Sequence, residues 1–285
     1  MSVQYLTPKI IREICENNEI HPVKKFGQNF MVDSGQIQKI VKIANVKTDD
    51  QILEIGPGLG SLTIGLLETG AKVLAVEIDK KLANLLPQTI QNMGVDNSRL
   101  NILTKDALTL LKSDLAQYFD MTKPIKLVAN LPYNVATPII ITLLERFENL
   151  EEFLVLVQAE VAERLVAEPG SKIYGIPSVK LAWFGKAKNA GIIPRSAFFP
   201  VPRVDSKLVN FKRTNLILKN EFRDKVFALI NLGFSARRKT LKSLLVHDGN
   251  DSEKVTKILD SLQIDPMARA EVLNITQFIE IAERL

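Results

Sequence analysis

The sequence is poor in the residues that form disulfides and most transition-metal sites. Its 285 residues include one cysteine and two histidines. A single thiol cannot form an internal disulfide, and protein zinc sites are commonly built from cysteine and histidine. We therefore expect neither a disulfide framework nor a metal centre. The lone Cys15 is typical of a protein from a reducing compartment.

Long apolar runs are also missing. No stretch of eighteen apolar residues occurs, and the N-terminus lacks the apolar core of a signal peptide. Internal repeats and low-complexity tracts are absent as well. These absences argue against a membrane-spanning protein, and we expect a soluble cytoplasmic one.

The charge balance is basic, but only slightly. Lysine and arginine number 37 against 32 aspartate and glutamate, which gives a net charge of +5 and a pI near 9.1. The excess gathers between Val201 and Asp248, where eleven basic residues face four acidic ones. A local surplus of this kind indicates a polyanionic partner such as a nucleic acid, although ordinary surface charge remains an alternative.

The segment Gln51–Thr63, QILEIGPGLGSLT, joins an apolar run to a glycine-spaced turn and the start of a helix. Gly56, Gly58 and Gly60 let the backbone turn sharply and approach a ligand closely. A dinucleotide fingerprint would need a third glycine where Ser61 stands. Glu77, about twenty residues later at a strand end, suits the ribose diol of a nucleotide or of S-adenosylmethionine. A purely structural tight turn is the alternative.

Apolar runs and helical spacings alternate along the first two thirds of the chain, which predicts a Rossmann-like α/β fold with a parallel sheet. An N-terminal helix is expected from Pro8 to about Asn17, and Asp33 is expected to cap the next helix. Thr137 is expected to cap a later helix whose first residue is Pro138. The first expected strand is the apolar run that includes Ile52, Leu53 and Ile55. It is followed by strands at 73–78, 101–104, 125–129 and 153–157 and by later strands at 179–184 and 206–211.

Four polar or glycine positions fall where these strands end: Gly56, Glu77, Asp106 and Asn130. Ligands of open parallel sheets bind beyond the carboxyl ends of the strands. The sequence therefore predicts a small-molecule site along that edge.

Beyond residue 213 the apolar spacing is helical throughout, so we expect a domain at 1–213 and a small helical domain at 214–285. Arg237, Arg238 and Lys239 are expected to open a helix of the second domain and to contact RNA phosphates. A solvated helix face is the alternative for these three residues.

The motif Asn130–Asn134, NLPYN, suits methyl transfer to an exocyclic amine of adenine. The amide oxygen of Asn130 and the carbonyl of Leu131, stiffened by Pro132, can accept the two N–H donors of the amine. Tyr133 can stack on the base. The alternative is a polar strand end followed by an ordinary turn.

Together these segments resemble the ribosomal RNA adenine dimethyltransferase family, most closely its bacterial small-subunit members. The matching stretches are KKFGQNFMVD, LEIGPGLGSLT, VEID, NLPYNVATP, VQAEVAERLVAEPGSKIYG, AFFPVPRVDS and FSARRKTLKSLL. The resemblance implies a seven-stranded methyltransferase sheet and S-adenosylmethionine as the donor. It also implies conversion of two adjacent adenosines near the 3′ end of small-subunit rRNA to N6,N6-dimethyladenosine.

The resemblance also assigns roles to single residues. It places the target base between Tyr133 and Phe198. Met31 stands where the family usually has leucine, and Arg195 where it often has proline. The cofactor contacts that it implies are Asn29, Met31, Gly56, Gly58, Glu77, Asp106 and Asn130.

Three other functions stay open at this point: a large-subunit enzyme of the antibiotic-resistance type, a small-subunit assembly factor with dispensable catalysis, and a DNA adenine methyltransferase. The expected partner is rRNA within an immature small subunit, and the expected oligomeric state is a monomer.

Overall fold

The computed structural model describes residues 3–20, 29–214, 220–236 and 238–285. They form two compact units. The first comprises the chain up to Ala162 together with Lys188–Arg213. The second comprises Glu163–Ala187 and the chain from Thr214 onward. In this division residues 163–187 group with the helical unit, and the domain bounds 1–213 and 214–285 stay a prediction.

The first unit is built on a seven-stranded sheet of order β4-β3-β2-β5-β6-β9-β7. The pairs among β4, β3, β2, β5 and β6 are parallel, and β9 is antiparallel to β6. The α/β fold and the seven strands are therefore confirmed. The strands are β2 (Gln51–Ile55), β3 (Lys72–Glu77), β4 (Leu100–Thr104), β5 (Ile125–Asn130), β6 (Leu150–Gln158), β7 (Gly185–Ile193) and β9 (Ser206–Arg213).

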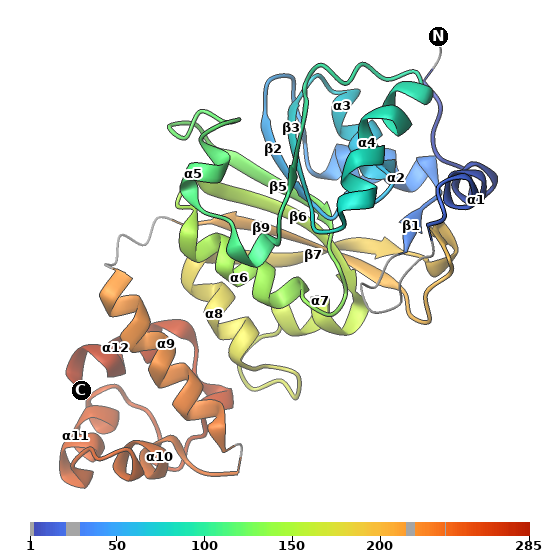
Figure 1. The fold of residues 1–285 in the computed structure, drawn as a ribbon. Helices are drawn as coiled ribbons and strands as arrows, with labels where there is room; N and C mark the ends of the chain where they lie inside the picture. The colour runs from blue at the N-terminus through green and yellow to red at the C-terminus, as the bar shows by residue number, and fades with distance from the viewer. Residues whose placement is uncertain (1–2, 21–28, 215–219, 237) are drawn as a thin grey trace. The chain divides into compact units, whose positions relative to one another are not determined.

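Helices cover both faces of this sheet, which explains why its central strands read as continuous apolar runs. All five residues of β2 are buried, as are five of the six in β3. The helices α2 (Ser34–Ile43), α3 (Ser61–Leu67) and α4 (Lys80–Asn92) gather on one side (Figure 1). On the other side lie α5 (Lys112–Leu115) and α6 (Ala136–Arg146).

The N-terminal segment folds as its capping residues predict. Thr7 caps α1 (Pro8–Asn17) by accepting the Ile10 N–H, and Asp33 caps α2 by accepting the Gln36 N–H. Between these helices, β1 (Phe30–Met31) pairs antiparallel with β8 (Phe198–Phe199). This small sheet fixes residues 29–31 to a loop far along the chain. The apolar side chains of both strands join the core of the first unit.

The second unit is helical, as expected. The rings of Trp183 and Phe184 in the helix at 176–184 pack against Phe227 in the helix at 220–235. The helices are α8 (Ile176–Phe184), α9 (Asn220–Ser235), α10 (Leu241–His247), α11 (Ser252–Ser261) and α12 (Ile275–Arg284).

Several local predictions were wrong. Residues 179–184 form part of α8 and not a strand, and the strand in this region is β7. Thr137 does not cap α6, because that helix begins at Ala136 and its N-cap is Val135. The expected helix start at residues 237–239 is also wrong, since α10 begins at Leu241 with Thr240 as its cap. The short α7 (Ala159–Leu165) had no predicted counterpart.

Within the described residues, no helix is both long and apolar enough to cross a membrane.

Candidate active site

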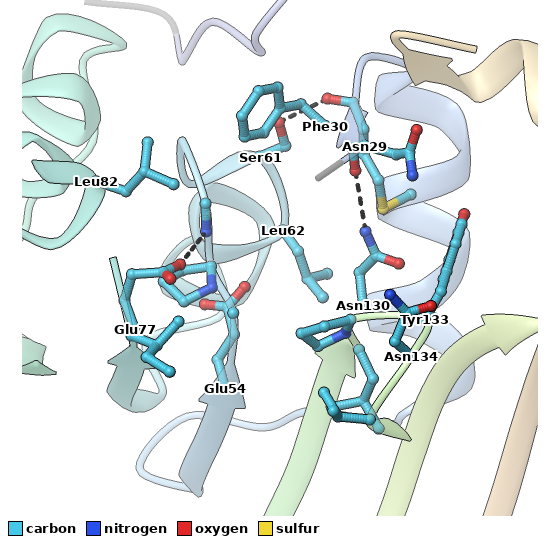
Figure 2. Close-up of a pocket in the computed structure, with 18 of the residues that line it drawn as sticks. Asn29, Phe30, Glu54, Ser61, Leu62, Glu77, Leu82, Asn130, Tyr133 and Asn134 are labelled. Atoms are coloured by element: carbon cyan, nitrogen blue, oxygen red, sulfur yellow. Dashed lines mark hydrogen bonds between the residues drawn. The ribbon is translucent and has the colours of Figure 1, made fainter. Parts of the chain in front are cut away.

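A pocket of about 310 Å³ opens at the carboxyl ends of β2, β3 and β5. This is the size range of small-molecule sites. Figure 2 shows Glu77 on one wall, Asn130 and Tyr133 on the opposite wall, and the Glu54 carboxyl between them. The sequence-predicted residues that line it are Asn29, Met31, Gly56, Gly58, Glu77, Asp106, Asn130, Leu131, Pro132 and Tyr133.

The glycine loop between β2 and α3 needs its glycines for two different reasons. Gly58 has φ +58°, and a Cβ there would lie 3.0 Å from the Phe30 ring. Gly60 has φ +93° at the N-cap of α3, where a Cβ would lie 2.6 Å from Leu86 of α4. The first glycine therefore lets the loop lie close against Phe30, and the second lets the start of α3 pack closely on α4.

Glu77 is the last residue of β3, and only 5% of its surface is exposed. Its two carboxylate oxygens accept the backbone N–H groups of Gly58 at 3.1 Å and Asp79 at 3.0 Å. Burial raises the pKa of Glu77, and these two hydrogen bonds oppose the rise. The carboxylate is thus fixed against the glycine loop and retains lone pairs for a ligand.

Apolar side chains flank the acidic groups. Ile78 is 53% exposed although it is a large aliphatic residue, and it lines the pocket together with Leu82 and Leu108. Asp106 accepts the Leu108 N–H at 2.9 Å and so caps the short helical turn Ala107–Thr109. This combination of a flat apolar wall with one carboxylate suits a planar heterocycle.

Sequence reasoning missed Glu54, which lines the pocket from the middle of β2. It is 2% exposed and accepts the Thr63 hydroxyl at 2.7 Å. Burial raises the pKa of Glu54 to about 8, Thr63 opposes the rise, and the charge of Glu77 adds to it. The sequence did contain a signal, because burying a carboxyl group inside an otherwise apolar strand costs free energy and indicates a functional role.

Apart from the Tyr133 phenol, the ionisable side chains that line the pocket are all carboxyl groups, and the raised pKa of Glu54 keeps that one mostly protonated at neutral pH. Among its described lining residues are Glu54, Glu77 and Asp106, and none is lysine or arginine. Such a site favours a cationic or donor-rich ligand over a polyphosphate.

Asn130, the last residue of β5, presents an unusual acceptor. Its Nδ2 donates to the Asn29 carbonyl at 3.3 Å, which assigns the orientation of the amide. The other amide atom, Oδ1, is buried and has no hydrogen-bond partner within the described part of the chain. The next residue, Leu131, is fixed to β6 because its backbone N–H donates to the Leu156 carbonyl at 3.0 Å. A buried acceptor without a partner is costly unless a ligand satisfies it.

Tyr133 lies in the turn that follows Pro132, with its ring on the pocket wall. Its hydroxyl is 3.1 Å from the Ser206 Oγ. Burial raises the pKa of Tyr133, and the Ser206 contact opposes the rise. Ser61 also lines the pocket, and its hydroxyl donates to the Met31 carbonyl at 2.6 Å, which ties α3 to β1.

Phe198 is not brought into the pocket. Its side chain is 1% exposed and does not belong to the pocket lining, because β8 pairs with Met31 of β1 and turns the ring into the core. Stacking of Phe198 on a target base would require this side chain to become exposed, so its role stays a prediction.

The expected RNA-contacting residues lie in the second unit. Arg237 falls outside the described residues. Arg238 and Lys239 are exposed in the turn between α9 and α10, so they precede the helix and do not open it.

The described residues contain no group of three or more histidine, cysteine, aspartate or glutamate side chains placed to hold a metal ion.

Comparison with known proteins shows the family to which the chain belongs. The family model described as ribosomal RNA adenine dimethylase matches residues 20–285. A protein of Bifidobacterium adolescentis named ribosomal RNA small subunit methyltransferase A is 48% identical and aligns over 96% of this chain and 92% of its own length. A protein of the same name from Corynebacterium diphtheriae is 42% identical over 99% of this chain and 95% of its own.

Solved structures agree on the fold. A dimethyladenosine transferase from Plasmodium falciparum superposes with a TM-score of 0.73 at 25% identity, covering 88% of this chain and 95% of the other. The 23S rRNA methyltransferase ErmE superposes with a TM-score of 0.66 at 23% identity, covering 90% and 99%. Because the family model matches residues 20–285, nearly the whole chain, this protein belongs to the ribosomal RNA adenine dimethylase family.

Proposed function

We propose that this protein transfers methyl groups from S-adenosylmethionine to N6 of two adjacent adenosines near the 3′ end of small-subunit rRNA, giving N6,N6-dimethyladenosine. The name carried by relatives at 42% and 48% identity supports the small subunit as the substrate. The likeness to ErmE extends to the fold alone and does not favour a large-subunit substrate.

The observation that carries the proposal is the buried Oδ1 of Asn130. An exocyclic adenine amine offers two N–H donors, and Asn130, which lines the pocket, holds a buried acceptor without a partner among the described residues. The adjacent carbonyl of Leu131 would supply the second acceptor. Two acceptors on one nitrogen favour a more tetrahedral amine, whose lone pair is then available for attack.

The pocket fits the donor that the family implies. When bound, S-adenosylmethionine supplies an electrophilic methyl group on a positively charged sulfur. Glu77 and Asp106 line the pocket with carboxyl groups that suit a cation, while Glu54, mostly protonated at neutral pH, adds a polar but neutral group. Glu77 would hold the ribose hydroxyls, and Ile78 with Leu108 would enclose the adenine of the cofactor.

The chain's own residues act mainly by positioning. Asn130 is fixed by its bond to Asn29, and Leu131 is fixed by its bond to β6. Tyr133 would stack on the target base, a contact worth about 1 to 3 kcal/mol. No general base is required, because the amine can lose its proton to water after transfer. Orientation of the amine therefore carries most of the catalysis.

We also propose that the substrate is rRNA within an immature small subunit and that the enzyme acts in the cytoplasm, where bacterial subunits assemble. Arg238 and Lys239, exposed in a basic turn, would contact RNA phosphates. The monomeric state stays a prediction.

The test is to incubate the protein with labelled S-adenosylmethionine and unmethylated small subunits, and to identify the labelled nucleoside. Label in N6,N6-dimethyladenosine of small-subunit rRNA supports the proposal. Label only in large-subunit rRNA or in DNA would refute it. Binding to small subunits without any label would point to an assembly factor.

A further inference from the structure

The phenol of Tyr133 meets a serine that lies 73 residues further along the chain. The Tyr133 hydroxyl and the Ser206 Oγ are 3.1 Å apart, and either atom can be the donor. Ser206 is fully buried, whereas Tyr133 is partly exposed and lines the pocket. The ring therefore faces the pocket while its hydroxyl is anchored inside the protein.

Ser206 is held from several directions. It is the first residue of β9 and pairs with Gln158 at the end of β6. The preceding residue, Asp205, accepts the Ala159 N–H through its carbonyl at 3.1 Å and the Arg195 N–H through its carboxylate at 2.9 Å. Backbone pairing to β6 thus fixes the position of the serine hydroxyl.

Among the described residues, no backbone hydrogen bond of this kind holds Tyr133. The residue lies in the turn between β5 and α6, where the Val135 N–H donates to the Pro132 carbonyl at 3.3 Å, a bond that does not involve Tyr133. Burial raises the pKa of Tyr133, so the phenol stays neutral and able to donate. Its bond to Ser206 is the contact that fixes the orientation of the ring.

We infer that Ser206 is a positioning residue for methyl transfer, which holds the Tyr133 ring in the orientation that stacks the target base beside Asn130. This inference rests on the proposed function, because it assigns the stacked ligand as an adenine of rRNA. It separates two tasks on one wall of the pocket: Asn130 accepts the amine, and the Tyr133–Ser206 pair sets the plane of the base.

The test is a double-mutant cycle of Ser206→Ala, Tyr133→Phe and the combined variant, assayed on unmethylated small subunits. Each single change removes the same hydrogen bond and leaves one buried hydroxyl without a partner. We expect each to lower kcat about tenfold, because a small misplacement of a reacting group is costly. The combined variant should be no slower than either single one. KM for subunits and calorimetric affinity for S-adenosylmethionine should stay within about twofold of wild type.

Ser178→Ala is the matched control, since Ser178 is also buried and its hydroxyl contacts the Arg164 carbonyl in the second unit. It should lower the melting temperature and leave kcat unchanged. Should Ser206→Ala fail to fold, Tyr133→Phe still removes the bond from the pocket side, and Ser206→Cys keeps a weaker partner for the phenol.

Three outcomes would overturn the inference: wild-type kcat in a folded single variant, rate losses that multiply in the combined variant, or losses that simply follow the melting temperature. A wild-type protein that methylates only large-subunit rRNA would refute the proposed function instead. The same cycle, run on that RNA, would still decide the role of Ser206.

Discussion

Glu77 reaches the pocket with both oxygens already bound to backbone N–H groups, which fixes its geometry before a ligand arrives. Glu77→Ala should therefore weaken S-adenosylmethionine binding by about 1 to 3 kcal/mol, the loss expected when a charged hydrogen-bond partner is removed. Calorimetry on the folded variant measures this. Glu151→Ala, an exposed carboxylate on β6, is the control and should bind as wild type does. Unchanged affinity in Glu77→Ala would remove this residue from the site.

Glu54 makes stability depend on pH. Its pKa is about 8 in the folded protein, against 4.5 ordinarily. Between these values the unfolded chain has lost a proton that the folded chain retains. The free energy of unfolding should therefore fall as the pH rises from about 4.5 to 8, by up to about 1.4 kcal/mol per pH unit, and then level off.

Glu54→Gln isolates this effect, because glutamine keeps an acceptor for Thr63 and carries no titrating proton. Urea unfolding of both proteins at pH 5, 6.5 and 8 should show the variant gaining stability relative to wild type as the pH rises. A difference that stays constant across the series would mean that Glu54 does not titrate in this range.

Among the elements, the turn into α3 depends on a glycine more than its sequence motif reveals. Gly60→Ala should lower the free energy of unfolding by about 2 to 4 kcal/mol, because it combines a left-handed φ with a clash against Leu86 of α4. Gly249→Ala is the matched control, since Gly249 has φ +99° and nothing within 4 Å of its added Cβ. It should cost only about 1 to 2 kcal/mol. Equal losses in denaturant unfolding would contradict the packing role of Gly60.

The sequence predicts the central strands well because both faces of a covered parallel sheet select uninterrupted apolar runs. It fails at α8, whose buried residues include Val179, Leu181, Trp183 and Phe184, so no polar face marks its helical period. It misses β7 because that strand is rich in glycine and lysine and depends on its pairing with β9. Tertiary contacts decide both elements.

The site residues likewise divide into those that the sequence pattern predicts and those that tertiary contacts decide. Strand-end positions such as Glu77 and Asn130 follow from the alternation of strands and helices alone. Which of Phe198 and Phe199 turns inward does not, because it is set by the register of β8 against β1. Contacts that join distant segments, such as Tyr133 with Ser206, leave no trace in spacing.

For the whole molecule, the two units would separate chemistry from phosphate binding. Arg238→Ala combined with Lys239→Ala should flatten the dependence of RNA affinity on salt by about one to two units of log–log slope, since each phosphate contact contributes about 0.9. Filter binding to small subunits across a salt series measures the slope. Calorimetry with S-adenosylmethionine should show no change.

Lys112→Ala combined with Lys123→Ala removes two exposed charges from the first unit and serves as the control, with the wild-type slope expected. A wild-type slope in the Arg238 and Lys239 double variant as well would mean that the basic turn only solvates the surface.

If the buried Oδ1 of Asn130 receives the reacting amine, its removal should slow methyl transfer far more than it weakens RNA binding. The most direct measurement is single-turnover methylation of unmethylated small subunits by Asn130→Ala at saturating S-adenosylmethionine, beside filter binding of the same preparation. The single-turnover rate should fall about 10²-fold below wild type with subunit affinity retained, because phosphate contacts supply most of the binding. A rate equal to wild type at saturating cofactor would mean that the Asn130 oxygen does not receive the amine.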